Sequence, residues 1–238
     1  MRDVYSRYWI TAREKIYGFL EYDRNLCRYI CRQIASGGKL LEVAIGTGYP
    51  FADFFQKAGY AVYGIDISPA LIEKCRQLNP SIDCKVGDAE ALEYPDDYFD
   101  CSYCFHSSWY FPDLNKAIDE MLRVTRAGGL VMFDIQNRNN EEIAGGYRKA
   151  LSRNRGTARM IRYAKEVVGW VISRGEVPMW HRVAAEVPTY PESIYAHLRE
   201  KGVSSFLVMV RHEDESIGAG NEIGALGNFA RLVFAVVK

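Results

Sequence analysis

The residue spacing with the clearest chemical meaning is a pair of glycines followed by an acid. Gly46 and Gly48 follow the apolar run 39–43, and Asp66 ends a second apolar run twenty positions after Gly46. Glycines let a backbone approach a ligand closely, and a helix that begins after them points its N-terminus at that ligand. A strand-end carboxylate suits the hydroxyls of a ribose. The pattern predicts a nucleoside-binding loop, although a GxG alone also occurs in ordinary tight turns.

A histidine stands where a parallel sheet would place its ligands. His106 follows Phe105 at the carboxyl end of the run 99–105, and open α/β sheets bind ligands at that edge. Histidine titrates in the range that a general base needs near neutral pH. Two interpretations stay open: a catalytic base, or a polar loop residue that caps the strand or touches a ligand. No carboxylate partner is visible in the sequence.

Two cysteines have a spacing that could indicate a metal or redox pair. Cys101 and Cys104 lie three positions apart inside the run 99–105, which is predicted to be a buried strand. Side chains three apart on a strand point to opposite faces, so the two thiols could not bind one ion together. We therefore predict structural thiols, and no metal site.

The elements that must position these residues alternate in type along the first part of the chain. Helices are predicted over 7–34, 51–58 and 114–124, and Ser68 and Pro69 open a further helix as cap and first-turn proline. Strands are predicted over 39–43, 61–65, 82–86, 99–105 and 130–135. This alternation predicts βαβ units and a parallel sheet.

The alternation of strands and helices stops after residue 137 and resumes near the C-terminus. Basic helices are predicted over 141–175, extended chain over 177–187, a helix over 191–201, a strand over 203–211, a glycine-rich turn over 218–227 and a strand over 229–237. The last two strands are too close in sequence for a helical crossover, so they should be antiparallel neighbours. We predict a doubly wound, Rossmann-like α/β fold of seven mostly parallel strands, the last antiparallel, with a helical insertion after the fifth. The units are 1–137, an insertion at 138–190, and 191–238.

The motifs together resemble those of the class I S-adenosylmethionine (SAM)-dependent methyltransferases, in particular the small-molecule enzymes. The resemblance rests on LLEVAIGTG at 40–48, GIDIS at 64–68, VGDAE at 86–90, YFD at 98–100 and RVTRAGG at 123–129. It implies that the first-strand acid and the glycine loop hold the methionyl part, the second-strand acid the ribose, and a later acid the adenine. The cofactor residues so predicted are Glu42, Ala44, Gly46, Gly48, Asp66, Ile67, Asp88, Ala89, Phe105, Tyr5 and Trp9.

One position departs from the family pattern. Ala44 replaces the first glycine of the loop, a substitution with little cost unless that position needs a positive φ. A dinucleotide-binding GxGxxG would need a small residue at Phe51, so a nicotinamide enzyme is disfavoured. Tyr5 and Trp9 precede the core on a segment that often folds over the cofactor in this family. Their rings suit a sulfonium cation, but plain packing of a helix explains them equally well.

Residues after the fourth and fifth strands are candidates for binding the methyl acceptor. Trp109 and Tyr110 could form a wall of an acceptor pocket, and Asn137, with Asp134 and Gln136, ends the fifth strand where it should face the crevice. The insertion carries nine basic and three acidic residues between 138 and 175. It is either a solvated helix face or a mobile cover whose Arg155, Arg159 and Arg162 meet an anionic acceptor or a membrane surface.

Composition limits the remaining possibilities. The chain has 238 residues and equal numbers of basic and acidic residues, 30 of each, so no global field recruits nucleic acid. No apolar run is long enough to span a membrane, and free cysteines favour the cytoplasm. We expect an enzyme that methylates oxygen or nitrogen of a small acceptor. The alternatives are a non-catalytic SAM-binding subunit and a nucleic-acid methyltransferase. The sequence predicts no particular oligomeric state.

Overall fold

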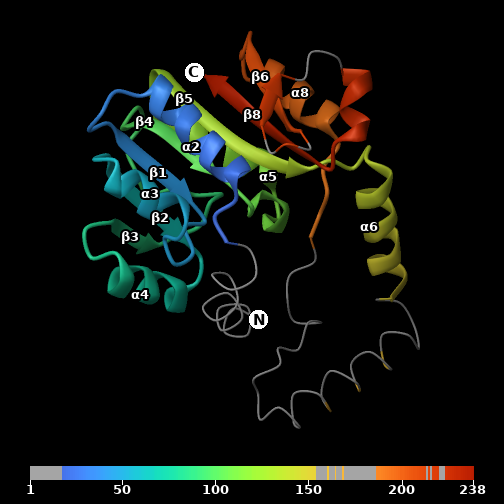
Figure 1. The fold of residues 1–238 in the computed structure, drawn as a ribbon, viewed down its shortest axis with the longest axis horizontal. Helices are drawn as coiled ribbons and strands as arrows, with labels where there is room; N and C mark the ends of the chain where they lie inside the picture. Colours follow the sequence, from blue (N-terminus) through green and yellow to red (C-terminus); the bar gives the residue numbers. More distant parts are fainter. Residues whose placement is uncertain are drawn as a thin grey trace.

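The computed structural model describes residues 18–153, 160, 164, 168, 186–212, 214, 216–219 and 223–238. Within these ranges a sheet lies between two layers of helices (Figure 1). The strands are β1 (Lys39–Val43), β2 (Ala61–Asp66), β3 (Asp83–Val86), β4 (Phe99–Cys104), β5 (Thr125–Gln136), β6 (Phe206–Arg211), β7 (Ile217–Ala219) and β8 (Arg231–Val237). The helices are α2 (Glu21–Gln33), α3 (Phe51–Lys57), α4 (Pro69–Leu78), α5 (Leu114–Val124), α6 (Glu141–Arg153) and α8 (Pro191–Glu200), with short 3-10 helices η1 (Ser108–Tyr110) and η3 (Ile223–Asn228).

The strand order creates a crevice at the carboxyl edge of the sheet. The order is β3-β2-β1-β4-β5-β8-β6-β7, and the five strands from β3 to β5 are parallel. The chain leaves β1 toward β2 on one side and later returns to β4 on the other side of β1. Connections after β1 and β4 therefore diverge, and such switch points are where open α/β sheets bind ligands. The glycine loop follows β1, and His106 follows β4.

Helices α2, α3 and α4 cover one face of the sheet. Their apolar sides form a continuous buried cluster with the strands, including Leu26 and Ile30 of α2, Phe51 and Phe55 of α3, and Tyr103 of β4. The rings of Phe55 and Tyr103 lie 5.2 Å apart between centroids. Burying each such side chain contributes roughly 1.5–3 kcal/mol. This face carries α2 close to the carboxyl edge, which matters for the site.

Helices α5 and α8 cover the opposite face. Ile118 and Met121 of α5 and Ile194 of α8 pack with Phe133 of β5 and Phe234 of β8. The rings of Phe133 and Phe234 are stacked, 5.3 Å apart. Strand β5 is buried between both layers, so its apolar run 130–133 is continuous rather than alternating.

The sheet has eight strands, not the seven predicted. The additional strand is β7, which pairs antiparallel with β6 and overlaps the start of the segment predicted as a glycine-rich turn. Three residues that include Gly218 carry no alternating pattern, so the strand could not be predicted from its residues. The predicted antiparallel pairing of the last long strands is confirmed, because β8 pairs antiparallel with both β5 and β6.

Most other boundaries lie within two residues of the predictions, with three exceptions. Ser68 accepts a hydrogen bond from the Leu71 amide and Pro69 opens α4, as predicted. The first described helix begins at Glu21 rather than running from residue 7 without interruption, because Gly18 has a φ of 55° and Leu20 is extended. Strand β5 begins at Thr125, five residues before its predicted start, and strand β6 begins at Phe206, three residues after its predicted start.

The longest described part of the insertion is α6, which begins five residues after the end of β5. Of the predicted basic helices, residues 141–153 are helical. Arg155, Arg159 and Arg162 lie outside the described residues. Residues 186–190 return to the core, where the Thr189 amide donates to the Gln136 carbonyl at 2.9 Å.

The two cysteines of β4 point to opposite faces of the sheet, as predicted. Cys101 belongs to the cluster under α2 and α3, and Cys104 belongs to the cluster under α5. The six cysteines are all free thiols in the structure, and burial raises the pKa of Cys101 far above its ordinary value. A buried, protonated thiol is a packing group and a poor nucleophile.

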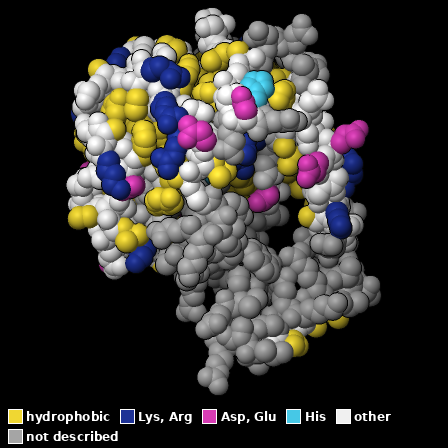
Figure 2. Space-filling view, viewed as in Figure 1, with side chains coloured by type: hydrophobic (Ala, Val, Ile, Leu, Met, Phe, Trp, Pro, Cys, Tyr) yellow, Lys and Arg dark blue, Asp and Glu magenta, His cyan; other side chains and the backbone are white. Residues whose placement is uncertain are grey.

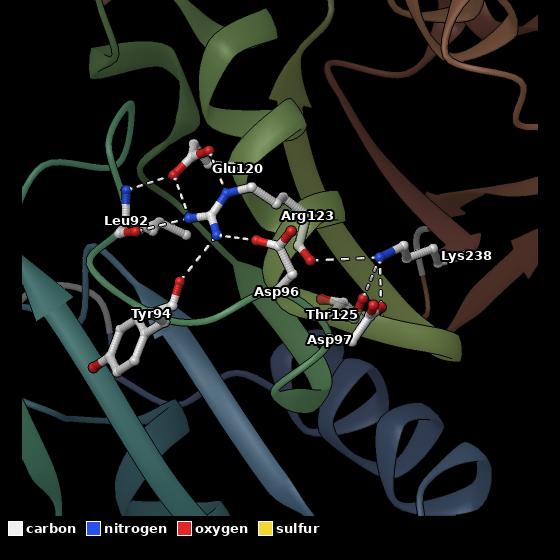
Figure 3. A network of polar contacts seen from close by, with 8 residues as sticks. All are labelled: Leu92, Tyr94, Asp96, Asp97, Glu120, Arg123, Thr125 and Lys238. Atoms are coloured by element: carbon white, nitrogen blue, oxygen red, sulfur yellow. Dashed lines mark hydrogen bonds and ion pairs between the residues drawn. The ribbon is translucent and has the colours of Figure 1, made fainter.

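Arg123 and Thr125 of the motif at 123–129 belong to a polar network at the amino edge of the sheet. This network holds the ends of the strands together at that edge. The Arg123 guanidinium donates to the carbonyls of Leu92 and Tyr94, at 2.8 and 2.9 Å (Figure 3). The Lys238 ammonium lies 2.7 Å from the Asp97 carboxylate. The network also includes Asp96, Glu120 and Thr125. Arg123 thus holds the segment before β4 against α5, far from the carboxyl edge.

The surface carries charges of both signs. Figure 2 shows Lys and Arg side chains over the region of α2, with acidic side chains among them. Arg24 and Arg28 of α2 both pair with Glu21, which reduces the local positive field. Every helix in the described ranges is too short or too polar to cross a lipid bilayer.

Candidate active site

The loop after β1 is organised by the carboxylate that ends β2. Asp66 accepts a hydrogen bond from the Gly46 amide at 3.0 Å through Oδ2 and from the Ser68 amide at 2.9 Å through Oδ1. Gly46 and Gly48 have φ values of 60° and 84°, a region that favours glycine. Asp66 is 7% exposed. The two elements predicted to share a ligand are therefore joined directly.

Gly48 occupies a position that no larger residue could fill without displacement. A Cβ there would lie 2.8 Å from Nδ2 of Asn79 and 3.0 Å from Sγ of Cys75. Asn79 in turn donates to the Thr47 carbonyl at 3.0 Å. The loop is thus packed against the end of α4 on one side, which leaves its other side to approach a ligand.

Ala44 adopts a backbone conformation that favours glycine and is costly for alanine. Its φ is 63°, where an L-residue with a Cβ is disfavoured by about 1–2 kcal/mol. The condition under which alanine was expected to be costly here, a positive φ, is therefore met. Strained residues of this kind persist where the surrounding structure holds them, often beside functional sites.

Glu42 is a buried acid beneath the loop. Its Oε2 accepts a hydrogen bond from the Tyr103 hydroxyl at 3.0 Å, and the residue is 3% exposed. Burial, together with the neighbouring Glu42 charge, raises the pKa of Tyr103 well above its ordinary value, so that hydroxyl stays protonated. A carboxylate at the end of β1 can bind a cationic group, such as the ammonium of a methionyl moiety.

The edge predicted for the adenine combines an exposed apolar side chain with acids. Ile67 is 46% exposed immediately after Asp66, and Ala89 is 7% exposed. Asp88 accepts a hydrogen bond from the Glu90 amide at 2.9 Å, which holds the turn after β3. An apolar surface beside strand-end carboxylates fits an adenosine. The tight loop, the organised Asp66 and this surface together fit SAM.

His106 ends β4 in a strained conformation and contacts two acids. Its φ is 61°, and its amide donates to Oδ1 of Asp134 at 2.9 Å. Its Nε2 lies 3.0 Å from Oδ1 of Asp23, and the two side chains are 19% and 2% exposed. The ring also meets Phe51 edge-on at 5.4 Å. The carboxylate partner that the sequence did not reveal is therefore Asp23, from α2.

Asp23 is positioned by the first turn of its helix. Its Oδ2 accepts a hydrogen bond from the Leu20 amide at 3.3 Å, in the capping arrangement of a helix N-terminus. Apolar burial of Leu26 and Ile30 docks α2 on the sheet and brings Asp23 to the end of β4. This contact could not be predicted from the sequence pattern, because it depends on how α2 docks on the sheet.

Asp134 of β5 is the second acid next to His106. It is 0% exposed, and its Oδ2 has Arg231 Nε at 3.8 Å, too far for a hydrogen bond. Burial raises the pKa of Asp134, an effect that the His106 and Arg231 charges partly oppose. The Arg231 guanidinium lies over the Trp109 ring at 4.9 Å. Trp109 is thus next to the acids, whereas sequence reasoning treated Asp134 only in passing and missed Arg231.

The remaining acceptor candidates have different surroundings. Tyr110 donates to Glu186 at 2.8 Å, and Gln136 donates to the same carboxylate at 2.8 Å. Asn137 is 0% exposed, and its Nδ2 donates to the Leu226 carbonyl at 2.7 Å. A second donation goes to the carbonyl of Phe229, and Oδ1 accepts from the amide of Asn139. The expectation that Asn137 faces the crevice is corrected, because its amide joins β5 to the segment before β8.

Phe105 is a core residue between neighbouring rings. It is 2% exposed, and its ring centroid lies 5.1 Å from that of Phe51 and 5.4 Å from that of Tyr103. It supports the position of His106 from within. Tyr5 and Trp9, the two predicted N-terminal cofactor contacts, lie outside the described residues.

Comparison with known proteins identifies relatives with one kind of chemistry. Residues 41–133 match the family model described as a methyltransferase domain. The chain is 27% identical over 175 residues to a phosphatidylethanolamine N-methyltransferase of Cereibacter sphaeroides, which covers 69% of this chain and 80% of that protein. It is 32% identical over 97 residues to a malonyl-[acyl-carrier protein] O-methyltransferase of Serratia marcescens, covering 41% of this chain and only 38% of that protein.

A solved structure supports the fold over the whole chain. A possible histamine N-methyltransferase of Thermotoga maritima, described as SAM-dependent, superposes with a TM-score of 0.61 at 17% identity and covers 100% of both chains. At this identity the likeness concerns the fold. The family match spans β1 to β5, the part of the sheet that carries the glycine loop, Asp66 and His106.

Proposed function

We propose that this chain is a class I SAM-dependent methyltransferase, as its match to the methyltransferase-domain model over residues 41–133 supports, and that it transfers a methyl group to an oxygen or nitrogen of a small acceptor bound beside His106. SAM supplies an electrophilic methyl group on a sulfonium. The protein's residues must align the acceptor with that methyl group and remove the acceptor's proton. The described relatives act on different acceptors, so this proposal names no compound.

The observation that carries the proposal is the contact between His106 and Asp23. The Asp23 carboxylate lies 3.0 Å from Nε2 without the geometry of a hydrogen bond, and its buried charge favours the tautomer with the proton on that nitrogen. Nδ1 is then the basic nitrogen. As the acceptor's oxygen or nitrogen forms its bond to the methyl carbon, its proton passes to Nδ1 and the carbon–sulfur bonding pair stays on sulfur. Asp23 stabilises the resulting imidazolium.

The cofactor residues have separate tasks in this proposal. Glu42 and the Gly46–Gly48 loop bind the methionyl part, Asp66 binds the ribose hydroxyls, and Ile67, Asp88 and Ala89 bind the adenine. Trp109 and Tyr110 stand on the acceptor side. A nucleic-acid acceptor has less support, because the formal charge is zero overall and the arginines at 24 and 28 are paired.

The test measures formation of the demethylated cofactor, S-adenosylhomocysteine (SAH), with a pool of amine and hydroxyl acceptors. We expect acceptor-dependent turnover by the unmodified chain, and a loss of about 100-fold or more in His106→Ala with SAM affinity nearly unchanged. Asp23→Asn should lose activity too, because the imidazolium that forms on proton transfer would lack its neighbouring carboxylate. Asp96→Asn is the control, because Asp96 pairs with Arg123 at the far edge. Wild-type turnover in His106→Ala would refute the assignment of the base.

A further inference from the structure

Five buried polar atoms at and beside His106 have no hydrogen-bond partner among the described residues. Two of them, Nε2 of His106 and Oδ1 of Asp23, lie 3.0 Å apart without the geometry of a hydrogen bond. The other three are Oη of Tyr22, Nε1 of Trp109 and Oδ2 of Asp134, whose residues are 1%, 5% and 0% exposed. An unsatisfied buried polar atom costs about 1–3 kcal/mol, so native proteins rarely keep several in one place unless something binds them.

The three atoms belong to one cluster. Asp134 accepts from the His106 amide, and Arg231 links Asp134 to Trp109 by lying 3.8 Å from the carboxylate and 4.9 Å from the ring. Burial raises the pKa of the Tyr22 hydroxyl, and the charges of Asp134 and Asp23 nearby raise it further. We call Tyr22, Asp23, His106, Trp109 and Asp134 the polar cluster.

The cluster offers a ligand mainly hydrogen-bond acceptors. A carboxylate oxygen only accepts, and a tyrosine hydroxyl can either accept or donate, whereas the Trp109 indole can only donate. An ammonium carries up to three N–H donors, whereas a hydroxyl carries one. An ammonium can therefore serve the Asp134 oxygen and the Tyr22 hydroxyl at once, which an alcohol cannot.

The net charge of the polar cluster also favours an ammonium over a hydroxyl. Asp23 and Asp134 are two buried carboxylates, and Arg231 is the cation next to them, at 3.8 Å from Asp134. With His106 neutral, one negative charge remains. Arg211 lies over the Tyr22 ring at 5.5 Å, but it is exposed, so water screens its contribution. Buried charges need an opposite charge nearby, and a cationic ligand supplies it.

We infer that the acceptor is an amine, bound as its ammonium between Asp134, Tyr22 and the Asp23–His106 pair. This inference rests on the proposed function and names its substrate class. The ammonium gives one proton to His106. The freed nitrogen lone pair then forms the N–CH3 bond as the S–CH3 pair moves to sulfur. Asp134 acts as a specificity-determining residue, because it holds the ammonium without taking part in proton transfer.

The test compares matched amines and alcohols as ligands of the full chain saturated with SAH. The probe pairs are benzylamine with benzyl alcohol, 2-phenylethylamine with 2-phenylethanol, and hexylamine with hexanol, titrated calorimetrically at pH 7. We expect at least one amine to bind about 10-fold or more tightly than its alcohol, the range expected for a charge-assisted hydrogen bond. In Asp134→Asn this ratio should fall below about 3-fold. The amide keeps the acceptor for the His106 amide, so the fold should persist.

Two controls make the result specific. Asp96→Asn makes the same chemical change at the far edge and should leave the ratio at its wild-type value. Asp97→Asn should also leave the ratio unchanged, because the Asp97 carboxylate pairs with Lys238 at the same far edge. Equal affinities within every pair, no binding by any probe, or an unchanged ratio in Asp134→Asn would overturn the inference. Selective amine binding without any SAH formation from SAM would instead contradict the proposed function and leave amine recognition standing.

Discussion

Alanine at position 44 holds the backbone in a conformation that glycine adopts more easily. Its φ is 63° in the loop after β1. We predict that Ala44→Gly raises the free energy of unfolding by about 1 kcal/mol, because relief of the left-handed strain exceeds the added chain entropy. Urea unfolding monitored by circular dichroism measures the change. Ala58→Gly is the control, since Ala58 has a φ of −81° and glycine there should not stabilise. A less stable Ala44→Gly would contradict the account of strain.

Asp66 holds the loop after β1, and we propose that it also binds the ribose of SAM. Because it accepts from the amides of Gly46 and Ser68, Asp66→Ala should lower the free energy of unfolding by about 1–3 kcal/mol and abolish measurable SAM binding. This substitution should therefore lower the stability as well as the SAM affinity, whereas loss of an acid that contacts only the ligand would leave the stability unchanged. Asp66→Asn separates the two effects, since it keeps one acceptor oxygen. We expect it to remain stable and to lose about 10-fold or more in affinity by calorimetry. Unchanged SAM affinity in both variants would show that the ribose does not bind at Asp66.

Asp134 should make the protein less stable than its amide variant at neutral pH. Burial raises the pKa of Asp134 in the folded state, so ionisation opposes folding above that pKa. As pH falls through the raised folded pKa toward the unfolded value near 4, this penalty is relieved. We predict that Asp134→Asn is about 1 kcal/mol more stable at pH 7 and gains less as the pH is lowered. Urea unfolding from pH 7 to 4 tests this; a gain that grows on acidification would contradict it.

At the scale of residues, relations set by short loops could be predicted from the sequence, whereas contacts that depend on the packing of distant segments could not. Gly46, Gly48 and Asp66 were found because short loops after adjacent strands fix their relation. The pairing of Asp23 with His106 could not be found, because it depends on the docking of α2. Asn137 was misjudged because the same polar strand-end position serves either a ligand or the neighbouring loop, and only the packing of residues 226–229 decides between them.

At the scale of elements, strand β2 and the loop after β1 must fit closely. A Cβ at Gly64 would lie 2.9 Å from Cβ of Ile45 and closer still to its Cδ1. We predict that Gly64→Ala destabilises the protein by roughly 1–3 kcal/mol through overpacking and weakens SAM binding by displacing the loop. Ile45→Val removes the Cδ1 atom and should recover part of both losses. A double-mutant cycle in thermal unfolding measures this coupling.

A matched glycine indicates whether the effect is local. Gly145 lies within α6 and has no heavy atom within 4 Å of a Cβ built there. Gly145→Ala should therefore stabilise the helix by about 0.5–1 kcal/mol. If Gly64→Ala is equally harmless, or if Ile45→Val has no influence on it, the close fit of β2 to the loop is refuted.

Element boundaries were predictable where local signals were strong. Ser68 and Pro69 opened α4 as predicted, and α5 matched its predicted range 114–124 because its apolar spacing is strongly helical. Strand β7 could not be predicted, since its pairing with β6 is set by the partner strand and not by its own residues. Strand β5 begins five residues before its predicted start and includes Gly128, whose amide donates to the Lys238 carbonyl.

At the scale of the whole molecule, the fold brings two independent halves of the site together. The loop after β1 and the end of β4 lie on adjacent strands at the point where the strand order reverses. The first half provides the features that fit SAM, and the second provides the polar cluster. The alternation of strands and helices was sufficient to predict this arrangement, because right-handed crossovers leave few topologies. The contribution of α2 to the second half was not predictable.

The most direct test of the whole account is a crystal structure of the chain with SAH. The account predicts that the ribose hydroxyls bind Asp66 and the homocysteine lies against Glu42 and the Gly46–Gly48 loop. The thioether sulfur should face the side of the crevice that carries His106 and Asp134. A ligand bound elsewhere, or a sulfur that points away from His106 with the polar cluster sealed from it, would contradict the account.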